Sequence, residues 1–440
     1  MSHDFPNGLD RRHFLTAMAA AVGSSALPLP AFAQSRVKTK ARIVIAGAGA
    51  AGLATANRLI SQLDGAEITL IDKRREHYYQ PGFTLIGAGL KPASYAVSRT
   101  ADFVPRNVSL IEEAVAEIDP VGNKVVTESG RAVAYDYLVV ATGLELNYGG
   151  IAGMETSLIG KNGIGSIYAG PEQAFATWQE MSRFTEKGGV GLFGRPITEM
   201  KCAGAPLKYT FITDDYLRRR GMRGKAELIF AAQNNTLFSV PIVSEKVRML
   251  FGDRGVKVNY DHVLTAIDPG KKIATFKTPK GNVEIGYDFT NVVPPMRAPA
   301  AVRSSPLPWQ SGPFAEDGWM EVDKGTLRHT RFSNVFGVGD IAGVPKGKTA
   351  ASVKWQVPVA VDHLVASIAD KKSSSLYTGY TSCPLITRIG QAMLVEFDYN
   401  NNLVPSFPGV IAPLEELWVS WVIKEVALKP TYVAMLRGMA

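Results

Sequence analysis

Short apolar segments alternate with longer mixed segments along most of this chain. Arg42 to Ala46 and Glu67 to Ile71 are two of them, and an alanine-rich stretch to about Leu63 lies between them. Gly188 to Gly194 and Ala226 to Ala231 repeat the pattern later in the chain. Continuous apolar segments indicate strands buried on both faces, and mixed segments between them indicate helices. The pattern therefore predicts an α/β fold with parallel sheets.

The first strand leads directly into a glycine-rich turn, Gly47-Ala48-Gly49-Ala50-Ala51-Gly52, and the second strand ends at Asp72. A G-x-G-x-x-G turn between strand and helix, with an acid about 20 residues later, is the dinucleotide-binding fingerprint. Gly47 allows the sharp turn, Gly49 admits a pyrophosphate, and Gly52 lets the helix pack against the strand. Asp72 is expected to bind a ribose hydroxyl.

Two further apolar strands end in small residues, at Ala141-Thr142-Gly143 and at Gly339-Asp340. In this order after the fingerprint, they resemble the Ala-Thr-Gly and Gly-Asp motifs of flavoproteins with two dinucleotide-type domains. The resemblance implies that Asp340 binds the ribityl chain of FAD. A helix starting near Lys348 and Thr349 would direct its N-terminal dipole at the flavin. We therefore expect FAD rather than NAD at this first site.

A second dinucleotide-type domain is expected between these motifs. Relatives that use NAD(P)H carry a second glycine fingerprint after the strand that ends at Gly194. Here the segment from Arg195 to Cys202 takes that place, so no second pyrophosphate cradle is visible. Electrons are therefore not expected to come from NAD(P)H.

Composition narrows the choice of partners. The chain has 440 residues and a net charge of +8, but its lysines and arginines are scattered. No aromatic-interleaved basic patch and no helix-turn-helix or zinc spacing is present, so neither nucleic acid nor a metal is expected. A modest positive charge suits an anionic membrane surface or substrate.

The N-terminus predicts a targeting segment. Arg11 and Arg12 precede an uncharged apolar run that ends at Ala31-Phe32-Ala33, the spacing of a signal-peptidase site. Paired arginines indicate a twin-arginine signal over residues 1–33, the alternative being a short buried helix. We therefore expect a periplasmic protein, peripherally bound to the inner membrane.

Only two cysteines are present, Cys202 and Cys383, and they are 181 positions apart. In an oxidising compartment such a pair can be one structural disulfide. Cys202, however, precedes a predicted helix N-terminus and has Lys201 and Lys208 nearby, which favours a stabilised thiolate. A structural disulfide and a redox-active pair both remain possible on these grounds.

Three motifs make the resemblance specific: Lys201-Cys-Ala-Gly-Ala-Pro-Leu-Lys208, Tyr380-Thr-Ser-Cys-Pro-Leu385 and Tyr78-Tyr-Gln-Pro81. They resemble the sulfide:quinone oxidoreductases, in the branch that includes the mitochondrial enzyme. The resemblance implies a redox-active pair in which Cys383 takes sulfide as a persulfide and Cys202 passes electrons to FAD. Lys208 would hold anionic sulfide or thiolate. Sulfide, a membrane quinone and an acceptor of sulfane sulfur are the expected partners.

The resemblance also implies which residues bind FAD. The expected residues are Gly47, Ala48, Gly49, Ala51, Gly52, Asp72, Lys73, Gln80, Val115, Ala141, Thr142, Gly143, Gly339, Asp340, Lys348 and Thr349. No third cysteine exists to tether the flavin, so FAD should be held non-covalently. Two alternatives are a flavoprotein sulfide dehydrogenase that delivers electrons to a cytochrome c partner and a non-catalytic redox-sensing flavoprotein.

The C-terminal stretch from Pro413 has apolar residues at helical spacing, among them Trp418 and Trp421. Tryptophans favour the membrane boundary, and Lys424, Lys429 and Arg437 could meet lipid head groups. We expect peripheral membrane contact here; packing on the domain, or in an interface of a possible homo-oligomer, is the alternative.

These observations predict two Rossmann-like three-layer domains and a membrane-facing segment. The FAD domain is expected at 40–153 and 317–375, the second domain with Cys202 at 154–316, and the C-terminal segment with Cys383 at 376–440.

Overall fold

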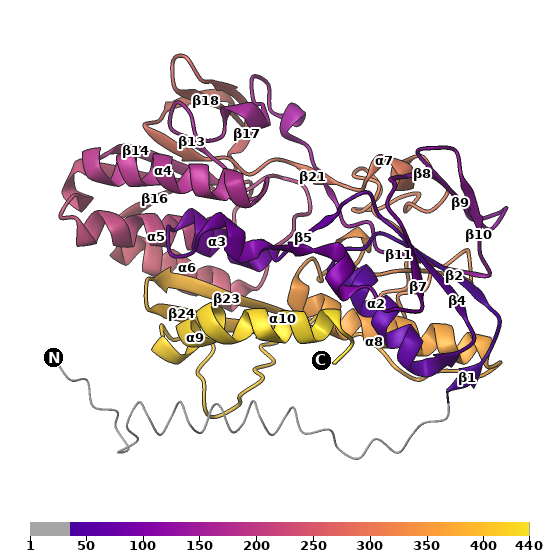
Figure 1. Ribbon diagram of the computed structural model, residues 1–440. Coiled ribbons are helices and arrows are strands. Elements are labelled where there is room, and N and C mark those ends of the chain that lie inside the picture. Colours follow the sequence, from indigo (N-terminus) through magenta and orange to yellow (C-terminus); the bar gives the residue numbers. More distant parts are fainter. Residues whose placement is uncertain (1–35, 440) are drawn as a thin grey trace.

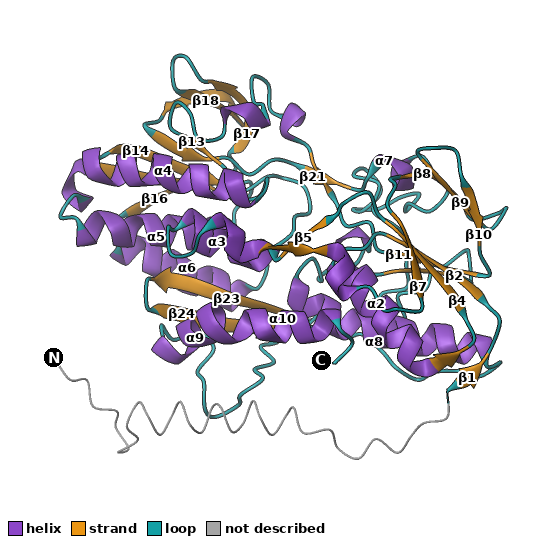
Figure 2. Ribbon diagram, viewed as in Figure 1, coloured by secondary structure: helices purple, strands orange, loops and turns teal. Residues whose placement is uncertain are grey.

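The computed structural model describes residues 36–439 (Figure 1). The segment predicted to be a signal, residues 1–33, lies outside the described residues. Two parallel sheets form the frame, each covered by helices, and a β-hairpin followed by C-terminal helices lies against them (Figure 2). The prediction of an α/β fold with dinucleotide-binding architecture is confirmed.

The first parallel sheet has five strands in the order β22-β11-β2-β4-β7. Their bounds are β2 Arg42–Ala46, β4 Glu67–Ile71, β7 Val108–Ile111, β11 Tyr137–Val140 and β22 Val335–Gly337. Helices α2 (Ala50–Gln62) and α8 (Ala350–Ile368) contact each other beside this sheet. All four strand pairings are parallel, so the carboxyl ends of the strands lie at one edge.

The second parallel sheet has the order β13-β20-β14-β15-β16. Its strands are β13 Ile164–Gly165, β14 Gly189–Gly194, β15 Ala226–Ala231, β16 Val256–Asn259 and β20 Phe289–Asn291. The helices of this half are α4 Pro171–Lys187, α5 Ala205–Arg219 and α6 Pro241–Asp253. Helix α5 also packs against the C-terminal hairpin, which links this half of the molecule to the chain's last segment.

Smaller elements complete the frame. Two antiparallel sheets consist of β8 Val115–Asp119, β9 Lys124–Thr127 and β10 Ala132–Ala134, and of β17 Val263–Asp268, β18 Ile273–Thr278 and β19 Gly281–Gly286. Short pairs are β1 Val37–Lys38 with β3 Leu63–Asp64, β5 Glu76–Tyr78 with β6 Val97–Arg99, and β12 Glu145–Leu146 with β21 Met296–Arg297. Two short helices are α3 Phe83–Gly87 and α7 Ala300–Arg303.

The C-terminal segment consists of the hairpin β23 (Thr381–Arg388) and β24 (Gln391–Phe397) followed by a helical stretch. That stretch comprises α9 (Trp418–Val422), a π-helical turn (Ile423–Ala427) and α10 (Leu428–Leu436). The helical pattern predicted from Pro413 therefore starts later and is interrupted. No helix among the described residues is long and apolar enough to cross a membrane.

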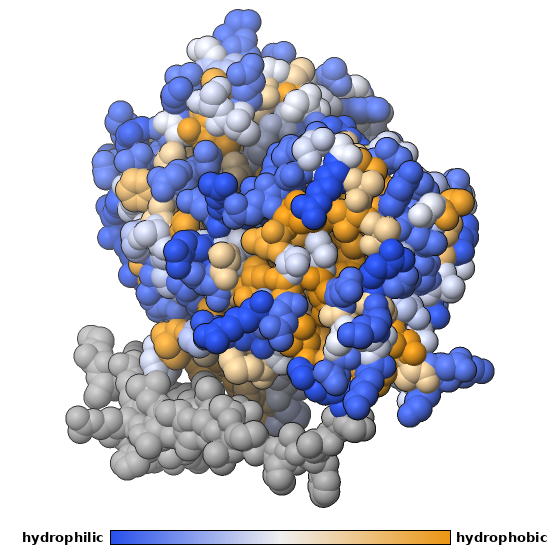
Figure 3. All heavy atoms as spheres, turned by 45° about the vertical axis from the view of Figure 1, so that its right-hand side comes forward, coloured by the Kyte–Doolittle hydropathy of each residue, from blue (hydrophilic) through white to orange (hydrophobic). Residues whose placement is uncertain are grey.

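The main hydrophobic core is continuous from the first sheet to the C-terminal helices. Trp421 belongs to this core and is only 6% exposed, so the prediction that it contacts the membrane is wrong. The physical reason is that α9 packs against the β23–β24 hairpin, so protein covers this helix where lipid contact was expected. Apolar residues also reach the surface: in Figure 3 they gather at the centre of one face, framed by polar residues.

Candidate active site

The glycine turn after β2 is shaped by close packing. Gly47 has a φ of +106°, and a Cβ there would overlap the carbonyl oxygen of Ala141. A Cβ at Gly52 would overlap the carbonyl oxygen of Gly47. At Gly49 the nearest atom to an added Cβ is an Arg74 nitrogen at 3.6 Å, so space remains at the N-terminus of α2. Free N–H groups, open space and no acidic residue in the first turn suit a pyrophosphate.

Asp72 anchors this turn. Its Oδ2 accepts hydrogen bonds from the Ala48 N–H at 2.8 Å and from Arg74 at 2.9 Å. Burial acts to raise the pKa of Asp72, but Arg74 and the Ala48 N–H outweigh burial and lower it overall. The carboxylate is therefore ionised and can still accept from a ribose hydroxyl. Arg74, which the sequence analysis did not single out, keeps the Asp72 carboxylate ionised.

The other expected flavin residues follow β11 and β22, at the same edge of the sheet. The Thr142 hydroxyl is buried and has no hydrogen-bond partner within the protein. The Gly339 N–H donates to Gln356 Oε1 at 2.7 Å, and an added Cβ there would lie 3.1 Å from the Cβ of Ala51. An unpartnered buried hydroxyl beside an open turn fits FAD, whose ribose and phosphate oxygens accept hydrogen bonds.

Two lysines influence the buried carboxyl of Asp340. Burial raises the pKa of Asp340, while Lys201 and Lys348 act in the opposite direction. Burial lowers the pKa of Lys348 to about 8, and its Nζ donates to the carbonyl oxygens of Asp340 and Ala342, at 2.6 and 3.1 Å. Lys348 thus holds the Gly339–Asp340 turn in place.

The remaining residues that were expected to bind the flavin lie on several different elements. Thr349 caps α8 by accepting from the Ser352 N–H, as the predicted helix start requires. Gln80 accepts a hydrogen bond from Lys201 Nζ at 2.7 Å. Lys73 is exposed after β4, and Val115 is the first residue of β8.

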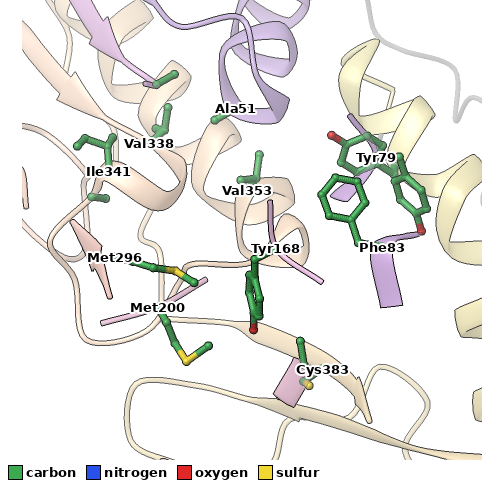
Figure 4. Close-up of a cluster of buried hydrophobic side chains, with 14 of the residues drawn as sticks. Ala51, Tyr79, Phe83, Tyr168, Met200, Met296, Val338, Ile341, Val353 and Cys383 are labelled. Carbon is green, nitrogen blue, oxygen red and sulfur yellow. The ribbon is translucent and has the colours of Figure 1, made fainter. Parts of the chain in front are cut away.

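The loop that carries Cys202 reaches Cys383, although the two cysteines are far apart in sequence. Cys383 is buried in β23, and a Cβ added to Gly204 would overlap its Sγ, so the loop that carries Cys202 packs directly on Cys383. Both thiols are free. Figure 4 shows Cys383 with Tyr168 above it, on the other side of the site from Ala51 and Val353.

Hydrogen bonds hold the Cys202 loop in a strained form. Cys202 has a φ of +50°, in the left-handed region that side chains other than glycine rarely adopt. Its N–H donates to the Lys348 carbonyl at 3.0 Å, and its own carbonyl accepts from the Tyr168 hydroxyl at 3.2 Å. The loop is therefore connected to the turn that carries Asp340, and strain of this kind is common at functional sites.

Two lysines supply positive charge to the cysteines. Lys208 Nζ lies 3.7 Å from Cys202 Sγ. Burial acts to lower the pKa of Lys208, but Cys202 and Cys383 outweigh burial, and its pKa is raised. Burial raises the pKa of the Cys383 thiol, against the opposing charges of Lys208 and Lys424. Lys208 is therefore charged and lies where it would stabilise either thiolate.

The position of Lys424 was predicted wrongly from the sequence. It was expected to meet lipid head groups, but its side chain is 2% exposed and donates to the Pro81 carbonyl oxygen. It lies in the π-helical turn, a feature frequent at functional sites. Its spacing of three from Trp421, on the apolar side of the helix, was the available signal for burial.

The buried Lys424 should make stability depend on pH. Burial and the charge of Lys208 lower its pKa to about 7, from 10.5. Between these pH values the unfolded chain binds more protons than the folded one, so the free energy of unfolding rises with pH. Lys424→Met should remove this rise and melt at a higher temperature than wild type below pH 7. Thermal melts from pH 6 to 10 test this; exposed Lys372→Met should retain the wild-type slope, and an unchanged slope in Lys424→Met would contradict the assignment.

The fold and the site define a class, the flavoproteins that couple a dinucleotide-type fold to a pair of cysteines. Residues 41–174 match the family model described as pyridine nucleotide-disulphide oxidoreductase. The sulfide:quinone oxidoreductase of Aquifex aeolicus has a similar structure, with a TM-score of 0.74 at 22% sequence identity over 91% of this chain and 92% of that one. At that identity the likeness supports the fold.

The sequences of relatives identify the family. The mitochondrial sulfide:quinone oxidoreductase of Dictyostelium discoideum is 36% identical over 90% of this chain and 88% of its own length. That of Mus musculus is 35% identical over 84% and 81%. The chain therefore belongs to the sulfide:quinone oxidoreductase family, and it is an FAD-binding enzyme.

The relatives overturn one prediction. Three proteins that are 34% to 36% identical to this chain, from Dictyostelium discoideum, Mus musculus and Schizosaccharomyces pombe, are mitochondrial. The prediction of twin-arginine export and a periplasmic location is therefore wrong. Asp4 and Asp10 balance the two arginines of this segment, so the order of charged and apolar residues did not by itself identify an export route.

Proposed function

We propose that this chain oxidises sulfide to sulfane sulfur through Cys202 and Cys383 and passes the electrons by way of FAD to a membrane quinone. The observation that carries the proposal is the packing of the Cys202 loop on the Cys383 sulfur beside the buried cation of Lys208. The same loop is bonded through Lys348 to the turn of Asp340. The cysteine pair and the flavin-binding edge are thereby joined.

The reaction starts from the disulfide form of the pair. Hydrosulfide attacks the Cys383 sulfur, the S–S bond breaks, and its electron pair goes to Cys202 as a thiolate. Cys383 is left as a persulfide, and Lys208 stabilises the thiolate at Cys202. Transfer of the outer sulfur to an acceptor returns Cys383 to a thiolate. FAD, when bound, would supply a two-electron acceptor, to which the Cys202 and Cys383 thiolates would give up two electrons as their S–S bond re-forms, with quinone as the final acceptor.

The residues proposed to hold FAD come from three turns at one edge of the first sheet. The turn of Gly47 to Gly52 with Asp72 would take the pyrophosphate and ribose, and Thr142 and Asp340 would bind other oxygens. We further propose residues 40–153 and 317–375 as the FAD domain and 154–316 as the second domain. The oligomeric state stays a prediction.

Anaerobic mixing of the FAD-loaded protein with sulfide tests the function. Sulfide should bleach the flavin absorbance, and a quinone should restore it. NADH should bleach it far more slowly, because the segment from Arg195 to Cys202 replaces the glycine turn after β14. Flavin that stays oxidised with sulfide would refute the proposal.

We also propose peripheral membrane contact, through the loop between β24 and α9 rather than through Trp421. This loop projects from the body beside α9 and α10 (Figure 1). Val410, in this loop, is 72% exposed, and Phe407 is also exposed. Val426, in the π-helical turn, is exposed as well. Exposed apolar side chains in one region favour burial in the boundary layer of a bilayer.

The double variant Phe407→Ser with Val410→Ser should bind liposomes about tenfold more weakly, because it loses apolar area that lipid would bury. Turnover with a long-chain quinone should fall, whereas flavin reduction by sulfide should persist. Val121→Ser, at another exposed valine, is the matched control. Unchanged liposome flotation in the double variant would exclude this loop as the contact.

A further inference from the structure

A small cavity lies at the carboxyl edge of the second parallel sheet. Strand β14 has β20 on one side and β15 on the other, and all three are parallel. Since the chain leaves β14 for β15 and adds β20 later on the other side, this is the switch point where α/β sheets bind ligands. The volume of this cavity is about 20 Å³, which is enough to hold one water molecule or one small ion.

The lining of this cavity is mostly apolar, and its polar residues are Thr290, Arg195 and Asn291. Its lining includes Leu192, Leu264, Phe276, Val293, Arg195 and Asn291. Asn291 is only 2% exposed, and both its amide nitrogen and its amide oxygen lack a hydrogen-bond partner. Arg195 Nε is buried and unpartnered too. The Asn291 amide nitrogen and Arg195 Nε are N–H donors, and a buried donor without a partner costs about 1–3 kcal/mol, so these two donors on the lining of one cavity indicate a ligand that accepts hydrogen bonds.

The charge at the cavity favours an anion. Arg195 Nη1 donates to the Leu237 carbonyl at 3.1 Å, which fixes the guanidinium but does not neutralise it. Burial lowers the pKa of Arg195, and Tyr168 and Glu199 oppose the shift. Arginine nevertheless stays charged in proteins. N–H donors from Arg195 and Asn291 in an apolar wall suit a soft monovalent anion better than a neutral water.

The cavity is close to the cysteine pair. The charges of Cys202, Arg195 and Cys383 all act on Tyr168, and the Tyr168 hydroxyl donates a hydrogen bond to the Cys202 carbonyl oxygen. Arg195 also begins the segment that ends at Cys202. An anion at Arg195 would therefore lie one side chain, Tyr168, away from the reacting sulfurs.

We propose that this cavity binds one small monovalent anion and that its physiological ligand is hydrosulfide, held between Arg195 and Asn291 before it reacts with the cysteines. The choice of hydrosulfide rests on the proposed function; the anion site itself does not.

Bromide soaks of crystals of the FAD-loaded protein test the anion site. An anomalous peak between Arg195 and Asn291 is the expected result, and a water at that position in the soaked crystal would overturn the proposal. Kinetics in chloride show whether the site serves hydrosulfide or is only a structural halide site. If chloride competes with hydrosulfide, it should raise the apparent KM for sulfide and leave kcat unchanged. A halide that binds without affecting the KM for sulfide would mean a structural halide site and refute hydrosulfide.

The variant Asn291→Asp tests the anion site independently, because it keeps the shape of the side chain and adds a negative charge that would repel an anion. The bromide peak should disappear, and the KM for sulfide should rise about tenfold or more with little change in kcat. Asn282→Asp, at an exposed position of β19, is the matched control and should behave like wild type. If Asn291→Asp does not fold, the wild-type soak and the chloride kinetics decide. Bromide binding in a protein without sulfide turnover would refute the proposed function and spare the anion site.

Discussion

Cys202→Ser and Cys383→Ser should each retain bound FAD and a cooperative melt while turning over sulfide with quinone at least ~10²-fold more slowly. Serine has almost the volume of cysteine, so the packing of the Cys202 loop on β23 survives. Its hydroxyl, however, is neither a comparable nucleophile nor able to form the S–S bond that sulfide attacks. Steady-state quinone reduction and thermal melts of both variants check the prediction.

A structural disulfide would behave differently. A bond closing so long a loop would be worth on the order of 3–5 kcal/mol, so its loss would lower stability and spare turnover. Early melting with near-normal sulfide-to-quinone turnover in both variants would therefore sink the redox role. Ser382→Ala, next to Cys383 on β23, is the matched control for a small change in that strand. Its turnover should match wild type.

Gly49→Val should produce folded protein with FAD occupancy lowered about tenfold or more, because valine would fill the space that the pyrophosphate needs. The residue itself tolerates a side chain, since only an Arg74 nitrogen lies near an added Cβ. Flavin released by acid denaturation, measured per protein and compared with the circular dichroism spectrum, checks the prediction. Full occupancy in a folded variant would place the pyrophosphate elsewhere.

Two other glycines calibrate this result. Gly52→Ala should give little folded protein, because its Cβ would overlap the Gly47 backbone. Gly252, in α6, has no neighbour within 4 Å of an added Cβ, so Gly252→Val should retain wild-type flavin content. The three variants separate loss of the flavin site from loss of the fold.

The local pattern of the sequence determined the strand–turn–helix units. The turn after β2 could be predicted in detail, because Gly47 needs its positive φ and Gly52 packs on the Gly47 carbonyl within the same βαβ unit. The motifs at Thr142 and Asp340 also indicated the same edge of the sheet, since carboxyl ends of parallel strands meet there. Local backbone geometry is short-range, so a short run of residues specifies it.

Contacts between distant segments required the tertiary structure. The spacing of Cys202 and Cys383 did not separate a structural disulfide from a redox pair, and only the packing of the Cys202 loop on β23 brings Cys383 to Cys202 and Lys208. Helical spacing showed that Trp421 and Lys424 lie toward one side of a helix, but not whether lipid or protein covers that side. Lipid and a protein core are both apolar, so hydrophobic periodicity cannot tell which of them covers a helix. In the structure the β23–β24 hairpin contacts α9 and the Pro81 carbonyl binds Lys424, so protein covers this side.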